Sequence, residues 1–339
     1  MEIVRIGLDL AKNVFEVCGV DMRDVVVLRK TLRRDEVPQF FAQLPPCLIG
    51  MEACSSSHYW AKVLSDLGHQ VRLIAPQFVT PYVKSNKNDR NDAEAISRPS
   101  MRFVPPKSSE QLEIQAVHRI RQRLVSSRTR LVNQIRGLLA EHGVVVGRDV
   151  SRLRRVLSEI VEEAECSLGG LLQELVSEIH QELTALDGRI CSYDRRIRHL
   201  YRTNEMCQRI GKIEGIGPIT ATALVAAVGD QSCFKNGRQF AAWLGLVPKQ
   251  QSSGGKSRLF GISKRGDRYL RTLLIHGARA VLGKAGGKQD TRSVWINQMR
   301  KRRHPNVVAV AIANKNARII WSILSKNEEY YGPQSLQIT

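Results

Sequence analysis

Four carboxylates are the residues of this chain whose types and positions best suit chemistry. Asp9 lies in IGLDLAKN and Glu52 in LIGMEA, each directly after an apolar run. Asp89 and Asp92 lie three residues apart where a helix is expected to begin, so both would share one helix face. Hard divalent cations take oxygen ligands, and two ions about 4 Å apart hold the attacking and leaving oxygens of a phosphate displacement. The four side chains therefore indicate a site for Mg²⁺, with Mn²⁺ as a substitute.

Each of these carboxylates also has an ordinary structural interpretation. Asp9 would simply end a strand, and Asp92 would cap the helix that begins with DAEAI. Taken singly, each residue fits this interpretation at least as well as a metal site. Their joint occurrence favours the metal site, because four clustered carboxylates repel one another unless a cation neutralises them.

Short β-branched runs and turn residues predict the elements that carry the carboxylates. We expect strands at 3–8, 14–20, 25–32, 47–51 and 70–74, and helices at 36–43, 57–67 and from about 92. This βββαβαβα order is that of an RNase H-like α/β fold, in which the first and fourth strands are neighbours and the last helix packs beside them. The four carboxylates would then converge at one edge of the sheet.

Residues 108–205 predict a helical, coiled-coil region. From Leu172 the apolar residues recur at alternating intervals of four and three, which is typical of a heptad seam. An earlier helix over 110–141 has an apolar face, and the two helices would pair either within one chain or between chains. Arginines surround that face, and they fit a solvated surface and a nucleic-acid contact equally well. They are Arg119, Arg121, Arg123, Arg128, Arg130 and Arg136.

Residues 206–339 predict a mainly helical domain with two unusual segments. KIEGIGPITATALVAAVG matches the turn of a helix-hairpin-helix, in which Gly215 and Gly217 leave backbone N–H groups facing a phosphate. An ordinary connector between helices fits the same glycines. The second segment, from Gly245 onward, predicts a flexible basic loop. Its candidate nucleic-acid contacts are Lys256, Arg258, Lys264, Arg265 and Arg268.

Ser252 and Ser253 lie in this basic loop, beside a pair of glycines. A serine hydroxyl is a weak nucleophile unless a base or a metal ion activates it. No histidine or carboxylate lies close to either serine in the sequence. From the residues alone, a flexible loop with incidental serines is therefore the better interpretation.

Composition favours a polyanionic partner. The formal net charge of +20 exceeds what solubility requires and predicts attraction to a phosphate backbone. A cationic chain without a specific partner is the alternative. The seven cysteines are dispersed, without the spacing of zinc ligands, which favours a reducing cytoplasm. We expect neither a signal peptide nor an apolar run near the ~20 residues that span a membrane.

Taken together, these segments resemble the DEDD-type insertion-sequence transposases. Those proteins are related to the Piv and MooV DNA invertases and are described as bridge-RNA-guided recombinases. The resemblance covers nearly the whole chain in the family's order. Its matching stretches are IGLDLAKNVFEV, IGMEACSSSHYWA, NKNDRNDAEAI, NQIRGLLAEHG, GIGPITATALVAAVGD, FKNGRQFAAWLGLVPKQQSSGGKSRLFGISKRGDRYLRTLLIHGARA and ANKNARIIW.

The resemblance implies a RuvC-like domain at 1–107, a coiled-coil domain at 108–205 and a C-terminal transposase domain at 206–339. It implies that Ser253, rather than Ser252, is the nucleophile that forms a phosphoserine intermediate, with carboxylates and serine supplied by different subunits. The implied partners are donor and target DNA, a structured guide RNA and further copies in a dimer or tetramer, in the nucleoid of a bacterial cytoplasm. The implied Mg²⁺ ligands and catalytic acids are Asp9, Glu52, Asp89 and Asp92.

Two positions depart from the family's pattern. Glu214 stands where a proline usually precedes GIG, and the helix after Asp92 reaches Pro99 about one turn early. Two other functions also fit the residues. One is a hydrolytic nuclease of the junction-resolving type, which would use the same carboxylates with water. The other is a non-catalytic nucleic-acid-binding protein.

Overall fold

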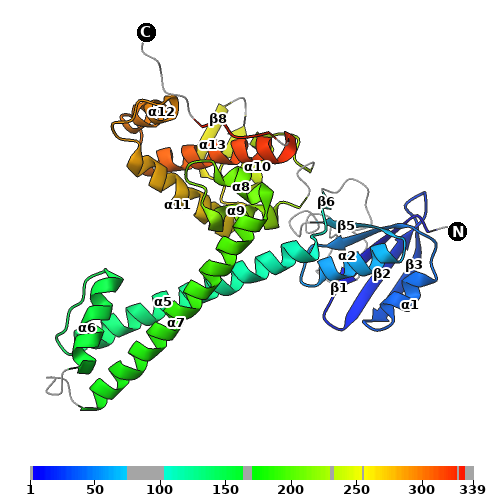
Figure 1. The fold of residues 1–339 in the computed structure, drawn as a ribbon. Helices are drawn as coiled ribbons and strands as arrows, with labels where there is room; N and C mark the ends of the chain where they lie inside the picture. Colours follow the sequence, from blue (N-terminus) through cyan, green and yellow to red (C-terminus); the bar gives the residue numbers. More distant parts are fainter. Residues whose placement is uncertain are drawn as a thin grey trace, which may run out of the picture. The chain divides into compact units, whose positions relative to one another are not determined.

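The computed structural model describes residues 3–74, 103–162, 170–229, 233–253, 256–326 and 328–332. The chain forms two compact units. The first combines residues 1–108 with the short segment 229–235, and the second combines residues 109–228 with 236–339. The first unit is built on a β-sheet, whereas the second is mainly helical (Figure 1).

The sheet of the first unit has six strands in the order β3-β2-β1-β4-β5-β6. The first three strands form an antiparallel meander, while β4 runs parallel to β1 and β5 runs parallel to β4. This confirms the predicted strand order and the adjacency of the first and fourth strands. The helix predicted from about Asp92 lies outside the described residues. The strands are β1 (Arg5–Leu10), β2 (Val14–Val20), β3 (Val26–Arg33), β4 (Leu48–Glu52), β5 (Gln70–Ile74) and β6 (Phe103–Val104).

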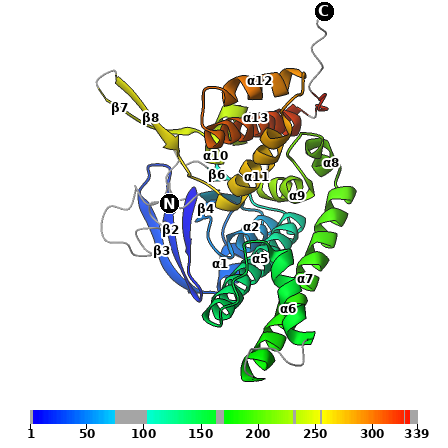
Figure 2. The ribbon, with the colours of Figure 1, turned by 90° about the vertical axis from the view of Figure 1, so that its left-hand side faces the viewer.

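One face of this sheet is covered by α1 (Val37–Ala42) and α2 (Ser57–Asp66), which share its apolar core (Figures 1 and 2). Leu8 of β1 and Met51 of β4 are fully buried in that core. Side chains alternate between the two faces of a strand. The residues that follow, Asp9 and Glu52, are therefore directed toward the opposite face.

Three helices form a long arm in the second unit: α5 (Ser109–Glu141), α6 (Val150–Glu162) and α7 (Gly170–Thr203). Two ion pairs join α5 to α7, one between Arg121 and Asp194 and the other between Arg128 and Asp187. The partner numbers fall along α7 as they rise along α5, so the two helices are antiparallel. The helices thus pack within one chain, while the coiled coil itself stays a prediction. The buried residues of the predicted seam are Val176, Leu183, Leu186, Ile190 and Ile197.

The remaining helices gather around α13 (Pro305–Lys326), which packs against α10 and α11. Among the described residues, α13 is one helix that is long and apolar enough to cross a membrane by length and composition alone, a test that the core helix of a soluble protein also passes. Half of its most apolar stretch is buried, as in a core helix. The other elements are α8 (Glu205–Gly211), α9 (Pro218–Ala227), α10 (Gly237–Trp243), β7 (Pro248–Ser253), β8 (Lys256–Ile262), α11 (Arg268–Lys284) and α12 (Thr291–Arg300).

A buried histidine ties the arm to these helices. His118 of α5 is 4 % exposed, and its ring nitrogens lie 2.9 Å from Thr222 Oγ1 of α9 and 3.0 Å from the Tyr269 hydroxyl of α11. Burial, and then the nearby positive charge of Arg121, lower the pKa of His118 to about 4. The ring is therefore neutral near pH 7, with one nitrogen to donate and one to accept a hydrogen bond.

The turn between α8 and α9 crosses α11 through two glycines. A Cβ on Gly277 would lie 1.8 Å from the carbonyl oxygen of Gly215, and a Cβ on Gly215 would lie 2.7 Å from that of Gly277. Gly215 also has a φ of +86°, which side chains rarely adopt. Both positions therefore require glycine so that the two backbones can touch.

This crossing predicts that two alanine substitutions in α11 change the unfolding free energy in opposite directions. Gly277→Ala places a methyl group on the Gly215 carbonyl, and we expect a loss of about 1–3 kcal/mol in unfolding free energy from overpacking. Gly283→Ala is the matched control, since nothing lies within 4 Å of its Cβ position. That variant should gain about 0.5–1 kcal/mol of helix propensity. Equal unfolding free energies for the two variants, measured by urea titration, would contradict the crossing.

Candidate functional site

Two of the predicted carboxylates lie at the ends of neighbouring strands. The parallel pairing of β1 with β4 aligns Leu8 with Met51, so Asp9 and Glu52 follow at the same level. Burial, and then the negative charges of Glu52 and Asp9, raise the pKa of the Cys54 thiol above its ordinary value. The register of β1 with β4 therefore places the two carboxylates at the ends of adjacent strands.

The other two predicted carboxylates, Asp89 and Asp92, lie outside the described residues. Among the residues that the structure does describe, no group of three or more His, Cys, Asp or Glu side chains has the geometry of a metal site. The described part of the site is thus the pair Asp9 and Glu52. Its oxygen donors fit a hard divalent cation, which needs further ligands to complete its coordination.

A third carboxylate, that of Glu16, lies at the same edge of the sheet as Asp9 and Glu52. Glu16 of β2 lies directly opposite Asp9 in the antiparallel ladder, and residues paired in this way point to the same face. Its carboxylate accepts a hydrogen bond of 2.8 Å from the Thr31 hydroxyl of β3. Glu16 is absent from the residues predicted from the sequence. The alternation of apolar and polar residues along 14–20, read against the register with β1, would have found it.

The segment that carries the two serines is a β-hairpin, which corrects the prediction of a flexible loop. β7 and β8 pair antiparallel, with Ser252 opposite Ser257 and Ser253 opposite Lys256. Ser253 is the last residue of β7, just before two glycines in the sequence. A glycine pair between two strands is a known hairpin signal. The many basic residues of this segment favoured the interpretation as a loop and obscured that signal.

The base of the hairpin is fixed to the helices around it. Arg271 of α11 is 8 % exposed, and its Nη1 donates hydrogen bonds to the carbonyl oxygens of Leu244 and Arg265, at 3.2 and 3.0 Å. A Cβ on Gly245 would lie 2.1 Å from the same Arg265 oxygen, so the chain that leaves the hairpin touches the end of α10. The predicted nucleic-acid contacts are all exposed on this hairpin or just after it: Lys256, Arg258, Lys264, Arg265 and Arg268.

Some of the arginines on α5 are explained by structure alone. Arg121 and Arg128 form the ion pairs with α7, and Arg136 donates a hydrogen bond of 2.6 Å to the Arg148 carbonyl oxygen. The remaining three are exposed, and their contact with nucleic acid stays a prediction. They are Arg119, Arg123 and Arg130.

The glycine turn is also held by a polar network. The Glu214 carboxylate accepts hydrogen bonds from Arg292 Nη1, at 2.6 Å, and from the Tyr330 hydroxyl, at 3.1 Å. Asn316 Nδ2 donates to the Glu214 carbonyl oxygen at 3.1 Å, and Arg292 Nη2 donates to Asn316 Oδ1 at 2.6 Å. Glu214 therefore joins the turn to α12, to α13 and to the segment after α13. The phosphate contact of Gly215 and Gly217 stays a prediction.

Known proteins resemble the chain over nearly its full length. The family described as "Transposase IS116/IS110/IS902 family" matches residues 207–293, and a DEDD-type transposase family matches residues 6–143. The chain is 55 % identical to a "Probable family 20 transposase" of Pseudomonas aeruginosa, over 97 % of this chain and 99 % of that protein. It is 44 % identical to the "Transposase for insertion sequence element IS1111A" of Coxiella burnetii, over 97 % of this chain and 92 % of that protein. A more distant relative is the "Pilin gene-inverting protein" of Moraxella bovis, with 23 % identity over 96 % of this chain and 97 % of that protein.

The sheet order, the pair of strand-end carboxylates and these matches define an enzyme that acts on DNA. The chain belongs to the IS116/IS110/IS902 family of insertion-sequence transposases. Its DEDD-type domain agrees with an RNase H-like fold and with the use of a divalent metal ion.

The network around Glu214 predicts that replacement of two glutamates by glutamine lowers the unfolding free energy by different amounts. Each of the two glutamates contacts an arginine at 2.6 Å. Arg292 is 6 % exposed, so Glu214→Gln leaves a buried cation without its anion, and we expect a loss of about 1–2 kcal/mol in unfolding free energy. Glu205 is 78 % exposed beside Arg209, so Glu205→Gln should change it by less than about 0.5 kcal/mol. Thermal unfolding at pH 7 measures both, and equal losses would contradict the role of burial.

Proposed function

We propose that this transposase cleaves and exchanges DNA strands in a Mg²⁺-dependent reaction with Ser253 as the nucleophile. The observation that carries the proposal is the alignment of Asp9 and Glu52 on β1 and β4, in a chain whose family acts on DNA. Asp89 and Asp92 would complete the ligand set. When bound there, Mg²⁺, or Mn²⁺ in its place, stabilises the negative charge that develops on the scissile phosphate.

The position of Ser253 supports its role as the nucleophile. It lies at the end of β7, in a hairpin whose base is anchored by the buried Arg271 and whose surface is strongly basic. The Ser253 oxygen forms a bond to phosphorus as the bond from phosphorus to a sugar oxygen breaks. The serine proton passes to solvent, and the leaving oxygen takes up a proton. The resulting phosphoserine keeps the ester bond, so a sugar hydroxyl of another strand reverses the step and joins the strands.

The proposal extends to the assembly, on the strength of the family resemblance. The carboxylates and Ser253 that form one active site come from different copies of the chain, in a dimer or tetramer on DNA. Each copy consists of a RuvC-like domain at 1–107, a coiled-coil domain at 108–205 and a transposase domain at 206–339. A structured bridge RNA selects the donor and target sequences. The site of action is the bacterial nucleoid.

Replacement of single serines tests the nucleophile. Ser253→Ala should abolish covalent protein–DNA adducts on element-end DNA with Mg²⁺, because no oxygen is left to bond to phosphorus, while DNA binding persists. Ser252→Ala, the neighbouring residue of β7, is the control and should form adducts at the normal rate. The reactions are stopped without protease treatment, so that any protein joined to the DNA stays attached. The adducts are then measured as shifted DNA bands on denaturing gels.

The same experiment separates the alternative function. A hydrolytic nuclease of the junction-resolving type would use water in place of the serine. Normal strand cleavage by Ser253→Ala, without any adduct in the wild-type protein, would favour that nuclease. Adducts that survive in Ser253→Ala would overturn the assignment of the serine.

A further inference from the structure

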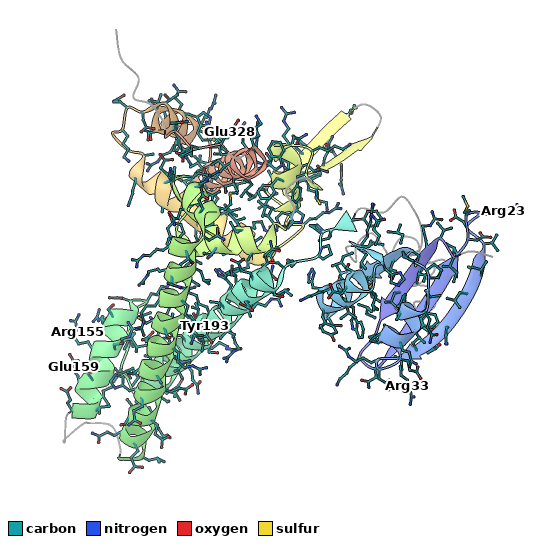
Figure 3. All side chains as sticks on the ribbon, turned by 45° about the vertical axis from the view of Figure 1, so that its right-hand side comes forward. Arg23, Arg33, Arg155, Glu159, Tyr193 and Glu328 are labelled. Carbon is teal, nitrogen blue, oxygen red and sulfur yellow. The ribbon has the colours of Figure 1, made fainter. Side chains whose placement is uncertain are left out.

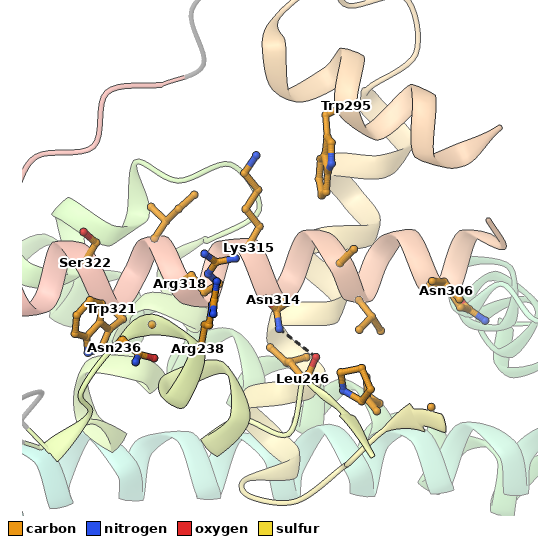
Figure 4. A pocket seen from close by; sticks show the side chains of 18 of the residues that line it. Asn236, Arg238, Leu246, Trp295, Asn306, Asn314, Lys315, Arg318, Trp321 and Ser322 are labelled. Atoms are coloured by element: carbon orange, nitrogen blue, oxygen red, sulfur yellow. Dashed lines mark hydrogen bonds between the residues drawn. The ribbon is translucent and has the colours of Figure 1, made fainter. Parts of the chain in front are cut away.

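A groove lies along one face of α13 in the helical unit (Figure 4). Its volume is about 1250 Å³. The positions of α13 that line it recur at intervals of three and four, as expected for one face of a helix, and extend from Val307 to Ser322. At 1.5 Å per residue this face is about 22 Å long. The start of α10, the base of the β7–β8 hairpin and Trp295 of α12 also line the groove.

Three aromatic side chains line the groove. Phe260 of β8 is 50 % exposed, and Trp295 of α12 and Trp321 of α13 are partly exposed. Lys315 Nζ lies 4.7 Å from the centroid of the Trp295 ring, so the ammonium group is held beside an aromatic face. Every nucleobase has a flat face that can stack on such rings, so a stacking surface of this kind accepts unpaired bases of any sequence.

The charge of the groove points to the same class of ligand. Arg238, Lys315 and Arg318 are exposed along it, and none of the described residues that line it is acidic. The start of α10 lies directly on α13, since a Cβ on Gly237 would lie 3.0 Å from Arg318 Cα. Arg238 and Arg318 therefore lie on adjoining segments that both line the groove. Cations beside exposed aromatic rings are the combination that binds the backbone and the bases of a single strand.

Three asparagine side chains add polar groups to the groove, and two of them already use their oxygens. Asn236 Oδ1 accepts a hydrogen bond from the Gln239 backbone N–H, and Asn306 Oδ1 accepts one of 3.2 Å from Arg279. The amides of Asn236, Asn306 and Asn314 line the groove, and Asn314 Nδ2 donates a hydrogen bond of 3.2 Å to the Leu246 carbonyl oxygen (Figure 4). This bond uses one amide donor and leaves the Asn314 side-chain oxygen as an acceptor. Amide side chains are suited to the edges of bases that are not already paired.

We propose that the groove along α13 binds a short segment of single-stranded DNA. Its bases stack on Phe260 and Trp321, and its phosphates contact Arg238 and Arg318. A face of about 22 Å accommodates about six nucleotides at the ~3.4 Å rise of a stacked strand. In a duplex the bases are stacked and paired with one another, so their faces are not available to the rings.

The groove complements the proposed function without depending on the serine chemistry. Pro248 and Ile262, at the base of the hairpin that carries Ser253, form part of its wall. Strand exchange passes through DNA whose strands are unpaired, and a strand held here would lie at the foot of that hairpin. Binding can be measured without cleavage, so a failure of one proposal does not imply a failure of the other.

A substitution that removes stacking without a change of charge tests the groove. In the full-length protein, Phe260→Ala should weaken the binding of a fluorescent oligothymidylate of about 12 nucleotides by roughly tenfold, because one base loses the ring on which it stacks. Leu259→Ala is the matched control, because Leu259 is also exposed on β8 and does not line the groove. Phe260→Trp should restore binding. The readout is fluorescence anisotropy.

A second pair of variants tests the charge. Arg318→Gln should weaken oligothymidylate binding and reduce its dependence on salt, because one phosphate contact is lost. Arg155→Gln makes the same charge change on the exposed surface of α6 and should have no such effect (Figure 3).

Four results would overturn the proposal. One is oligothymidylate binding that Phe260→Ala leaves unchanged. A second is that Phe260→Ala weakens the binding of duplex DNA of the same length by an equal factor. A third is a loss confined to oligoribonucleotides, which would make the groove an RNA site. The fourth is a change in the sedimentation of DNA-free Phe260→Ala, which would make the groove an interface between copies of the chain.

Discussion

The parallel pairing of β1 with β4 is the interaction on which the candidate site depends. It sets Asp9 and Glu52 at the same level on adjacent strands, although 42 residues separate them in the sequence. A shift of one residue in this register would turn Glu52 to the other face of the sheet. The buried partners Leu8 and Met51 oppose such a shift, because it would move Met51 out of the apolar core. The core thus fixes the geometry of the carboxylates.

In the helical unit, a few buried contacts hold the base of the serine hairpin in place. Backbone contact between Gly215 and Gly277 sets the glycine turn on α11, and the buried Arg271 joins α11 to the two ends of the hairpin. His118, held neutral by burial, links the same helix to the arm. The base of the hairpin is therefore anchored on a packed framework, while the exposed strands of the hairpin carry its cations into solvent. Such an anchor suits the nucleophile that we propose, Ser253, which must meet a phosphate in one orientation.

Much of this organisation follows from sequence patterns with a simple physical origin. Alternation of apolar residues predicted the strands, and the heptad spacing predicted the buried residues of α7, because both reflect which side chains avoid water. The serine hairpin was missed because its strands are polar and exposed. The contact of Gly215 with Gly277 joins residues that are distant in the sequence, and no local pattern encodes it. The positions of Asp89 and Asp92 in space stay a prediction.

We propose that the carboxylates on β1 and β4 form half of an active site, which Ser253 of another copy completes. The most direct measurement is Mg²⁺-dependent formation of covalent DNA adducts by Asp9→Ala and Ser253→Ala chains, expressed separately and together. Each variant alone should be inactive, and the mixed assemblies should regain adducts on the Asp9→Ala chain, which supplies the intact serine. Mixed assemblies that stay as inactive as either variant alone would contradict the claim.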